Sequence, residues 1–344
     1  MSKSDLSGTR KLYIPEGYSS KLDFTDTQDA IKMAKDVFQA NLSAALNLRR
    51  VTAPVIVTRN CGINDDLNGV ERKVDFTMKE IGGTAEVVQS LAKWKRMALY
   101  RYGFAPDTGL YTDMNAIRRD DEADNVHSIF VDQWDWERVI TKEERNVEFL
   151  KDIVRTIVFA VVGTKNAINM RYSALRCKLS NDVAFVTTSE LEDMYPDLTP
   201  KERENLFVKE HKTAFVMQIG GDLKNGKPHD GRAPDYDDWA LNGDILFWDE
   251  TLDCALEISS MGIRVDAESL DRQLTIRHAD DRRQYEYHKA ILEGKMPLTI
   301  GGGIGQSRLC MLLLEKAHIG EVQVSIWPEG MIEECAKHGI MILQ

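Results

Sequence analysis

The sequence predicts an α+β fold in which a mainly antiparallel, mixed sheet is flanked by helices. Segments with the alternating apolar pattern of strands are separated irregularly by segments with helical spacing, without a regular βαβ alternation. Of the 344 residues, 43% are hydrophobic and 29% are charged, as in ordinary globular proteins, and no internal repeat appears. We therefore expect a single domain over residues 1–344, with residues 1–20 as a flexible N-terminal extension.

The N-terminal half contains candidate helices and strands in turn. Apolar residues recur every three or four positions over 26–47, which predicts an amphipathic helix. Residues 49–57 follow it and read as a short turn into a β-rich run with Pro54 near its start. A second helix is expected over 87–102. A strand over 130–136 alternates polar with apolar residues, and the long apolar segment 154–168 has the spacing of a buried helix behind the sheet.

The C-terminal half continues the pattern with shorter segments. Strands are expected at 183–187, 213–219, 245–249 and 255–260. Charged or amphipathic helices are expected at 201–209 and 283–293, and the segment 220–239 is rich in turn residues. Mixed spacing of this kind favours antiparallel pairing of the strands.

A glycine-rich segment, 301–305, leads to Arg308 and the apolar stretch 309–314. The pattern is typical of a glycine turn that opens a buried helix, with positive φ angles that let a ligand approach the backbone closely. Arg308 in the first helical turn would add a fixed charge to free N–H groups, which suits a polyphosphate. The segment has neither the lysine of a Walker P-loop nor the acidic residue of a dinucleotide fold, and a plain tight turn before a core helix is the alternative.

Two further segments carry side chains suited to charged ligands. Arg118 leads into the acidic loop 120–124, where it either forms a surface ion pair or clamps a phosphate or carboxylate through two hydrogen bonds. Gln133 and Asp135 share one face of the following strand, opposite its tryptophans. Together they suit a ligand with both a carboxylate and an ammonium group, although a half-exposed strand is the alternative.

Carboxylates mark the remaining candidates. Glu257 and Arg264 lie seven positions apart around a small-residue turn, and Glu257 is either solvated or, beside a polyphosphate, a ligand of Mg²⁺. The loop 232–239 brings three carboxylates to an aromatic corner, unless it is a solvated surface loop. The cluster 62–69 has the composition of a turn.

Charge and hydropathy exclude several functions. The net charge of -11 argues against a large nucleic-acid surface, since binding to phosphate backbones draws on clustered Lys and Arg. No apolar run approaches the ~20 residues of a membrane span, and the N-terminus lacks the apolar region of a secretory signal. We expect a cytoplasmic protein with no nucleic-acid partner and no membrane association.

Five strings, taken together, carry a family resemblance. They read SLAKWKR at 90–96, VDQWDWER at 131–138, RAPDYDDW at 232–239, EISSMGIR at 257–264 and IGGGIGQSR at 300–308. Over nearly its whole length the chain resembles the ammonia-dependent asparagine synthetases, or aspartate-ammonia ligases. Through them it resembles the catalytic core of class II aminoacyl-tRNA synthetases, especially the aspartyl and asparaginyl enzymes.

The resemblance implies an enzyme that makes L-asparagine from L-aspartate, ammonia and ATP. The reaction would pass through a β-aspartyl-adenylate and release AMP and pyrophosphate. Mg²⁺ would accompany ATP, and two copies of the chain would form a homodimer through the helix and strand around 29–57. Free ammonia is the expected nitrogen donor, because we see no candidate glutaminase segment.

The resemblance also assigns residues to roles. At ATP it places Arg118 on the α-phosphate and the activated carboxylate, Arg308 on the terminal phosphates, Glu257 at Mg²⁺, and Gly303. Around aspartate it places Lys95, Gln133, Asp135, Asp237, Ser260 and Arg264. Asp65 would orient or deprotonate the incoming ammonium and, with Arg118 and Gln133, completes the expected catalytic set.

Some points stay open. Asp66 is the alternative to Asp65, although Leu67 and Gly69 favour Asp65, and Arg119 stands where the family has a proline. A true aspartyl- or asparaginyl-tRNA synthetase is a second reading, but the acidic charge and the lack of a basic anticodon-binding segment oppose it. A third is a non-catalytic regulatory relative that binds amino acids, which would be expected to have lost a motif arginine or the metal carboxylate.

Overall fold

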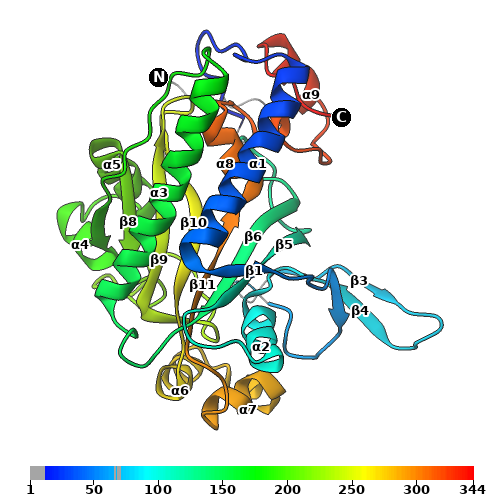
Figure 1. Ribbon diagram of the computed structural model, residues 1–344, viewed down its shortest axis with the longest axis vertical. Coiled ribbons are helices and arrows are strands. Elements are labelled where there is room, and N and C mark those ends of the chain that lie inside the picture. The colour runs from blue at the N-terminus through cyan, green and yellow to red at the C-terminus, as the bar shows by residue number, and fades with distance from the viewer. Residues whose placement is uncertain (1–11, 66, 68–70) are drawn as a thin grey trace.

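The computed structural model describes residues 12–65, 67 and 71–344 (Figure 1). Within this part of the chain, eight strands form one sheet in the order β1-β5-β6-β11-β10-β9-β8-β7. Their bounds are β1 Leu48–Arg50, β5 Gly109–Ile117, β6 Phe130–Val139, β7 Ala184–Thr187, β8 Thr213–Met217, β9 Asp237–Asp249, β10 Cys254–Arg264 and β11 Thr299–Gly305. The edge pairs β1–β5 and β7–β8 are parallel and the inner pairs antiparallel, which confirms the predicted mixed sheet.

Helices cover the sheet on both faces. Their bounds are α1 Phe24–Leu46, α2 Ala92–Tyr102, α3 Val147–Arg171, α4 Thr188–Met194, α5 Pro200–His211, α6 Ala267–Ile276, α7 Glu286–Leu292, α8 Gln306–Leu313 and α9 Met331–Lys337, with the 3₁₀ helices η1 Asp280–Gln284 and η2 Ile319–Glu321. The long helices α1 and α3 pack side by side across one face, next to α8, whereas α6 and α7 lie at one end of the molecule (Figure 1).

The helix α1 shows how the sequence fixes this arrangement. The Asp23 side chain caps its start by accepting a hydrogen bond from the Asp26 N–H at 2.8 Å. Its buried stripe includes Ala34 and Phe38, and Asn47 ends it in the left-handed conformation with φ of 54°. The stripe joins the main core between the sheet and helices α1, α3 and α8. The helix expected over 26–47 is confirmed, as is the buried helix expected over 154–168, which α3 extends at both ends.

A second core supports the other end of the sheet. Thr187 and Thr199 open α4 and α5 with reciprocal capping boxes to Glu190 and Glu202. Apolar side chains of these helices and of β7, β8, β9 and β10 then form a separate buried cluster. The charged helix expected over 201–209 is thus confirmed as α5, docked on the sheet.

A small sheet of three strands projects from the body (Figure 1). It contains β2 Ile56–Thr58, β4 Thr84–Val87 and β3 Asp75–Thr77, in that order. The helix expected over 87–102 is therefore wrong in its first turn, because Val87 pairs with Ile56 and α2 begins only at Ala92. Pairing with a distant strand overrides local helical spacing here.

The expected glycine turn is also wrong. Residues 299–305 form β11, hydrogen-bonded between β6 and β10, and none of its glycines has a positive φ. Similarly, β10 runs without a turn from Cys254 to Arg264, and β9 begins at Asp237, inside the segment expected to be turn-rich. Central strands buried on both faces lose the alternation that reveals a strand in sequence.

The expected N-terminal extension falls partly outside the described residues, since residues 1–11 are not among them. The described part contacts the body: the Tyr13 N–H donates to Asn125 Oδ1 at 2.7 Å, and the Tyr18 hydroxyl donates to Glu321 at 2.8 Å. The single-domain division stays a prediction. Among the described helices, none combines the length and apolarity needed to cross a bilayer.

Candidate active site

A cavity of about 580 Å³ lies over the middle of the sheet, and every candidate residue lines it. These residues are Asp65, Lys95, Arg118, Gln133, Asp135, Asp237, Glu257, Ser260, Arg264, Gly303 and Arg308. The predicted two-faced character of β6 is confirmed. Gln133 and Asp135 line the cavity, whereas Trp134 packs on Phe38 of α1 with ring centroids 4.9 Å apart.

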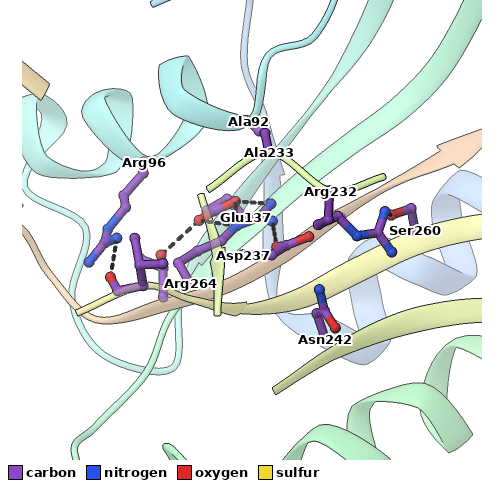
Figure 2. A network of polar contacts seen from close by, with 12 residues as sticks. Ala92, Arg96, Glu137, Arg232, Ala233, Asp237, Asn242, Ser260 and Arg264 are labelled. Atoms are coloured by element: carbon purple, nitrogen blue, oxygen red, sulfur yellow. Dashed lines mark hydrogen bonds and ion pairs between the residues drawn. The ribbon is translucent and has the colours of Figure 1, made fainter. Parts of the chain in front are cut away.

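Arg264 and Asp237 line the cavity and belong to a buried ion-pair network, which Figure 2 shows. The Arg264 guanidinium donates to Glu137 at 2.8–3.1 Å and to Asp237, and all three side chains are almost fully buried. Burial alone would raise the pKa of the Glu137 carboxyl, but the charges of Arg264 and Lys95 outweigh it and hold that pKa below its ordinary value. The network therefore presents a rigid, fully ionised guanidinium.

Lys95 is placed beside this network by α2. Its ammonium donates to Asp135 and, at 2.8 Å, to the Gly302 carbonyl, and its side chain is 1% exposed. Burial lowers the pKa of Lys95, although the charge of Asp135 opposes that effect. Lys95 and Asp135 thus form a preorganised charge pair in the wall of the cavity.

The glycines of β11 make room for these side chains. A Cβ added to Gly303 would lie 2.5 Å from Gln133 Oε1, and one added to Gly301 would collide with Glu137. Gly303 pairs with Asp135 and Gly301 with Glu137 across the β11–β6 ladder. The glycines of β11 therefore allow polar side chains of the neighbouring strand to lie directly against the β11 backbone. They do so in extended conformation, without positive φ angles.

Two arginines lie at the other end of the cavity. Arg118 follows the last residue of β5 and donates one long hydrogen bond, 3.5 Å from Nη2 to the Gln89 carbonyl. Arg308, in the first turn of α8, donates to the carbonyls of Val126 and Glu257 and lies 3.8 Å from the Glu257 carboxylate. Burial raises the pKa of Asp121, and the charges of both arginines act against that rise, so both lie within electrostatic reach of this carboxyl.

The loop before residue 66 contributes the buried Asp65 carboxylate to the lining of the cavity. Asp65 is 1% exposed and its Oδ1 accepts from the Leu67 N–H at 3.2 Å. Asn64 fixes the loop by accepting from the Gln89 N–H at 2.9 Å and donating to the Val87 carbonyl at 3.1 Å. The alternative position, Asp66, lies outside the described residues. That Asp65 and not Asp66 acts on the ammonium therefore stays a prediction.

Comparison with known proteins assigns the family. A sequence model described as aspartate-ammonia ligase matches residues 25–339. The aspartate–ammonia ligase of Clostridium tetani is 60% identical, over 97% of this chain and 98% of its own. That of Levilactobacillus brevis is 56% identical, over 96% of this chain and 99% of its own. The chain belongs to the aspartate-ammonia ligase family. This confirms the resemblance and the enzyme class, an ATP-using ligase that makes asparagine from aspartate and ammonia.

Solved structures similar to this aspartate-ammonia ligase family member confirm the fold. Asparaginyl-tRNA synthetase from Pyrococcus horikoshii, in complex with asparaginyl-adenylate, gives a TM-score of 0.62 at 16% identity, covering 88% of this chain and 70% of that one. Aspartyl tRNA synthetase from Entamoeba histolytica gives a TM-score of 0.59 at 14% identity, covering 88% of this chain and 58% of that one. The expected class II synthetase-like catalytic core is therefore confirmed.

Three residues of the ligase site escaped the candidate set. Glu137 continues the polar face of Gln133 and Asp135 two positions on, and that spacing was a usable signal. Arg232 donates to Asp244 at 2.6 Å and to Ser260 at 2.5 Å, so it holds one of the candidates (Figure 2). Asp244 lies inside a continuous buried strand, where the sequence carries no signal.

Asp244 has an unusual electrostatic setting in this ligase. Burial raises the pKa of its carboxyl to about 7; the charge of Arg232 opposes the rise, and the charge of Glu257 adds to it. Asp244 and Glu257 are thus close enough to repel each other. In the described residues no group of three or more His, Cys, Asp or Glu side chains forms a ready metal site.

Proposed function

We propose that the chain makes asparagine through a β-aspartyl-adenylate formed in this cavity. The observation that carries the proposal is the meeting, in one cavity, of two lightly bonded arginines with the buried charge network of Arg264, Asp237, Lys95 and Asp135. The arginines suit a triphosphate, and the network suits an amino acid with two carboxylates and one ammonium group. A fixed distance between the two ends aligns one carboxylate with the α-phosphorus.

Arg118 contacts the α-phosphate in this mechanism. Its Nε has no hydrogen-bond partner among the described residues, and its Nη2 bond is long, so the guanidinium retains donors for phosphate oxygens. Arg308 contacts the terminal phosphates, and its backbone acceptors keep its side chain beside Glu257. Both charges stabilise the transition state, in which negative charge shifts toward the leaving pyrophosphate.

The aspartate lies over the buried network. Arg264 and Gln133 donate to carboxylate oxygens, and Asp135 and Asp237 accept from the α-ammonium, while Lys95 and Ser260 complete the contacts. Arg264 is held by two carboxylates and Ser260 by Arg232, so these groups are fixed before the substrate arrives. Such preorganisation reduces the entropy lost on binding.

Two transfers complete the reaction. A β-carboxylate oxygen attacks the α-phosphorus, the bond to the bridging oxygen breaks, and pyrophosphate leaves with that electron pair. Ammonia then attacks the β-carbonyl carbon, and AMP leaves. Ammonium must lose a proton before it attacks, and the buried Asp65 carboxylate is the proposed acceptor.

Mg²⁺ is proposed as the companion of ATP. Glu257 would hold it, with Asp244 as a second carboxylate, because a divalent cation relieves the repulsion that helps to raise the pKa of Asp244. When bound, the ion would neutralise phosphate charge. The residues themselves supply one or two carboxylates, which matches what this ion takes from proteins when phosphate oxygens fill the remaining positions.

A homodimer is proposed from the family resemblance and the surface of the small sheet. Val55, Ile56 and Phe76 are 54%, 44% and 44% exposed, so apolar side chains are exposed at both outer strands of the small sheet, β2 and β3, which flank β4. Light scattering of the purified protein should give twice the mass of the chain. Ile56→Glu should shift that mass toward one chain, and an unchanged dimer would place the interface elsewhere.

The reaction is tested by product analysis. The purified protein, incubated with Mg-ATP and aspartate with and without ammonium, should form AMP and asparagine in equal amounts only with ammonium. Without ammonium it should still exchange labelled pyrophosphate into ATP when aspartate is present, which reports the adenylate. Release of ADP in place of AMP would reject the mechanism. Asp65→Asn should keep the exchange and lose asparagine formation.

A further inference from the structure

Asp235 is a fully buried carboxylate that does not line the cavity. Its Oδ2 accepts from Lys93 Nζ at 3.1 Å, from Arg282 Nη1 at 2.8 Å and from His288 Nε2 at 2.9 Å. Its Oδ1 has no hydrogen-bond partner among the described residues. Burial raises the pKa of Asp235, but Lys93, His288 and Arg282 together hold it well below its ordinary value, so the group is ionised.

This charge is costly and therefore needs its partners. A buried carboxylate loses its solvation by water, and only close cations and hydrogen bonds make up for that loss. The three partners come from α2, from η1 and from α7, which are separated by up to 195 positions, counted from Lys93 to His288. Asp235 thus ties the loop before β9 to elements at the end of the molecule.

The loop that Asp235 anchors carries the next two residues into the cavity. Tyr236 and Asp237 both line it, and the Arg264 guanidinium carbon lies 5.8 Å from the centre of the Tyr236 ring. Burial first, and then the charge of Asp65, raises the pKa of the Tyr236 hydroxyl. Tyr236 is therefore a protonated hydrogen-bond donor within electrostatic reach of Asp65.

The same supporting segment contacts the loop of Asp65. Gly62 has a φ of +75°, and a Cβ added there would lie 2.5 Å from Tyr285 Cγ, so the backbone rests directly on that ring. The Tyr285 ring lies 6.0 Å from the His288 ring, and His288 binds Asp235. A continuous series of contacts thus runs from Gly62 through Tyr285 and His288 to Asp235.

We propose that Asp235 and the segment 282–288 are positioning residues that hold the loop of Tyr236 and Asp237 in register with the loop of Asp65. The inference rests on the proposed function, because it takes the first loop as the aspartate side and the second as the ammonium side. One support beneath both loops fixes the distance that the attacking nitrogen must cover. A misplacement of about 1 Å at such a distance can cost about a hundredfold in rate.

The first test separates positioning from folding. Asp235→Asn should raise the KM for aspartate and for ammonium by about tenfold or more, while the KM for ATP, set by the other end of the cavity, stays within about twofold. Glu315→Gln is the matched control, because Glu315 is a buried carboxylate bound to Lys165 and Lys21 away from the cavity. It should lower the thermal midpoint without changing any KM.

The second test uses the other end of the contact series. Tyr285→Ala removes the ring under Gly62 at a half-buried position and leaves Asp235 intact. It should raise the KM for ammonium. In the double variant with Asp235→Asn, the free-energy change that corresponds to the rise in this KM should be smaller than the sum for the two single variants. Tyr285→Phe keeps the ring and should restore the wild-type KM.

The outcomes are distinct. If Asp235→Asn lowers the thermal midpoint as Glu315→Gln does and leaves every KM unchanged, the network is only structural and the inference is rejected. If Asp235→Asn does not fold, the single Tyr285 variants decide, and an unchanged KM for ammonium in Tyr285→Ala rejects the inference. If Asp235→Asn folds, additive effects in the double variant reject it as well. If the wild-type protein forms no asparagine from ammonium, the proposed function fails first, which the product analysis shows separately.

Discussion

Glu137 and Arg264 form an ion pair across a strand that lies between theirs. Glu137 is on β6 and Arg264 on β10, and β11 separates them with Gly301 at the crossing point. A Cβ atom added at Gly301 would clash with both Glu137 Oε2 and Arg264 Nη2. The site therefore depends on the absence of one side chain as much as on the presence of two.

The first prediction concerns Gly301→Ala. The added methyl group must displace the pair, so we expect a loss of about 1–3 kcal/mol in the free energy of unfolding and a raised KM for aspartate. Gly221→Ala is the control, since a Cβ there meets nothing within 4 Å. Urea titration and aspartate kinetics measure both. Equal behaviour of the two variants would contradict the close packing described here.

The second prediction concerns Glu137→Gln. The amide keeps the shape but loses the charge, so of the two ionic partners that Arg264 has among the described residues, Asp237 remains. Breaking a buried pair in this way costs about 3–5 kcal/mol. We expect reduced stability together with weaker aspartate binding, measured by calorimetry, with pyrophosphate inhibition unchanged. Unaltered aspartate binding would show that Asp237 suffices to orient Arg264.

The third prediction separates the two arginines of the phosphate end. Arg118→Lys keeps a charge but loses the paired donors, and the loss should appear in kcat, by about a hundredfold or more, because the contact strengthens in the transition state. Arg308→Lys should instead raise the KM for ATP. Pyrophosphate exchange with aspartate measures both without ammonium. If Arg118→Lys raises only the KM and leaves kcat unchanged, Arg118 does not act in the chemical step.

The fourth prediction is a pH dependence. With a pKa of about 7, the Asp244 carboxyl takes up a proton as the pH falls below 7 and loses it as the pH rises above 7. If it helps to hold the cation of Mg-ATP, the apparent affinity should increase from about pH 6 to about pH 8, because binding releases that proton. Titration calorimetry in buffers of different ionisation enthalpy measures the proton. Asp244→Asn should flatten the profile, and a persisting slope would assign it to another group.

The sequence predicted much of the site because its residues lie in the short strings that carry the family resemblance. Arg118, Gln133 and Arg308 were found in short segments, and the structure brings them into one cavity although they are far apart in the chain. Glycine placement was misjudged: a run of glycines indicates either a turn or a close approach, and only the pairing with β6 decides between them. Asp244 had no local signal. Asp235 was noted only as one of the three carboxylates of the loop 232–239, and its role could not be predicted because its partners lie on α2, η1 and α7.

The position of β11 has a consequence for how the protein is made. It is the last strand in the described part of the chain, yet it lies in the middle of the sheet, between β6 and β10. During translation, more than 30 further residues, 265–298, are synthesised after β10 and before β11. Until β11 has been made, the edges of β6 and β10 that it will join remain unpaired. Synthesis that stops before Thr299 leaves those edges open and the Glu137–Arg264 pair uncovered. We expect such truncated chains to associate through the open edges.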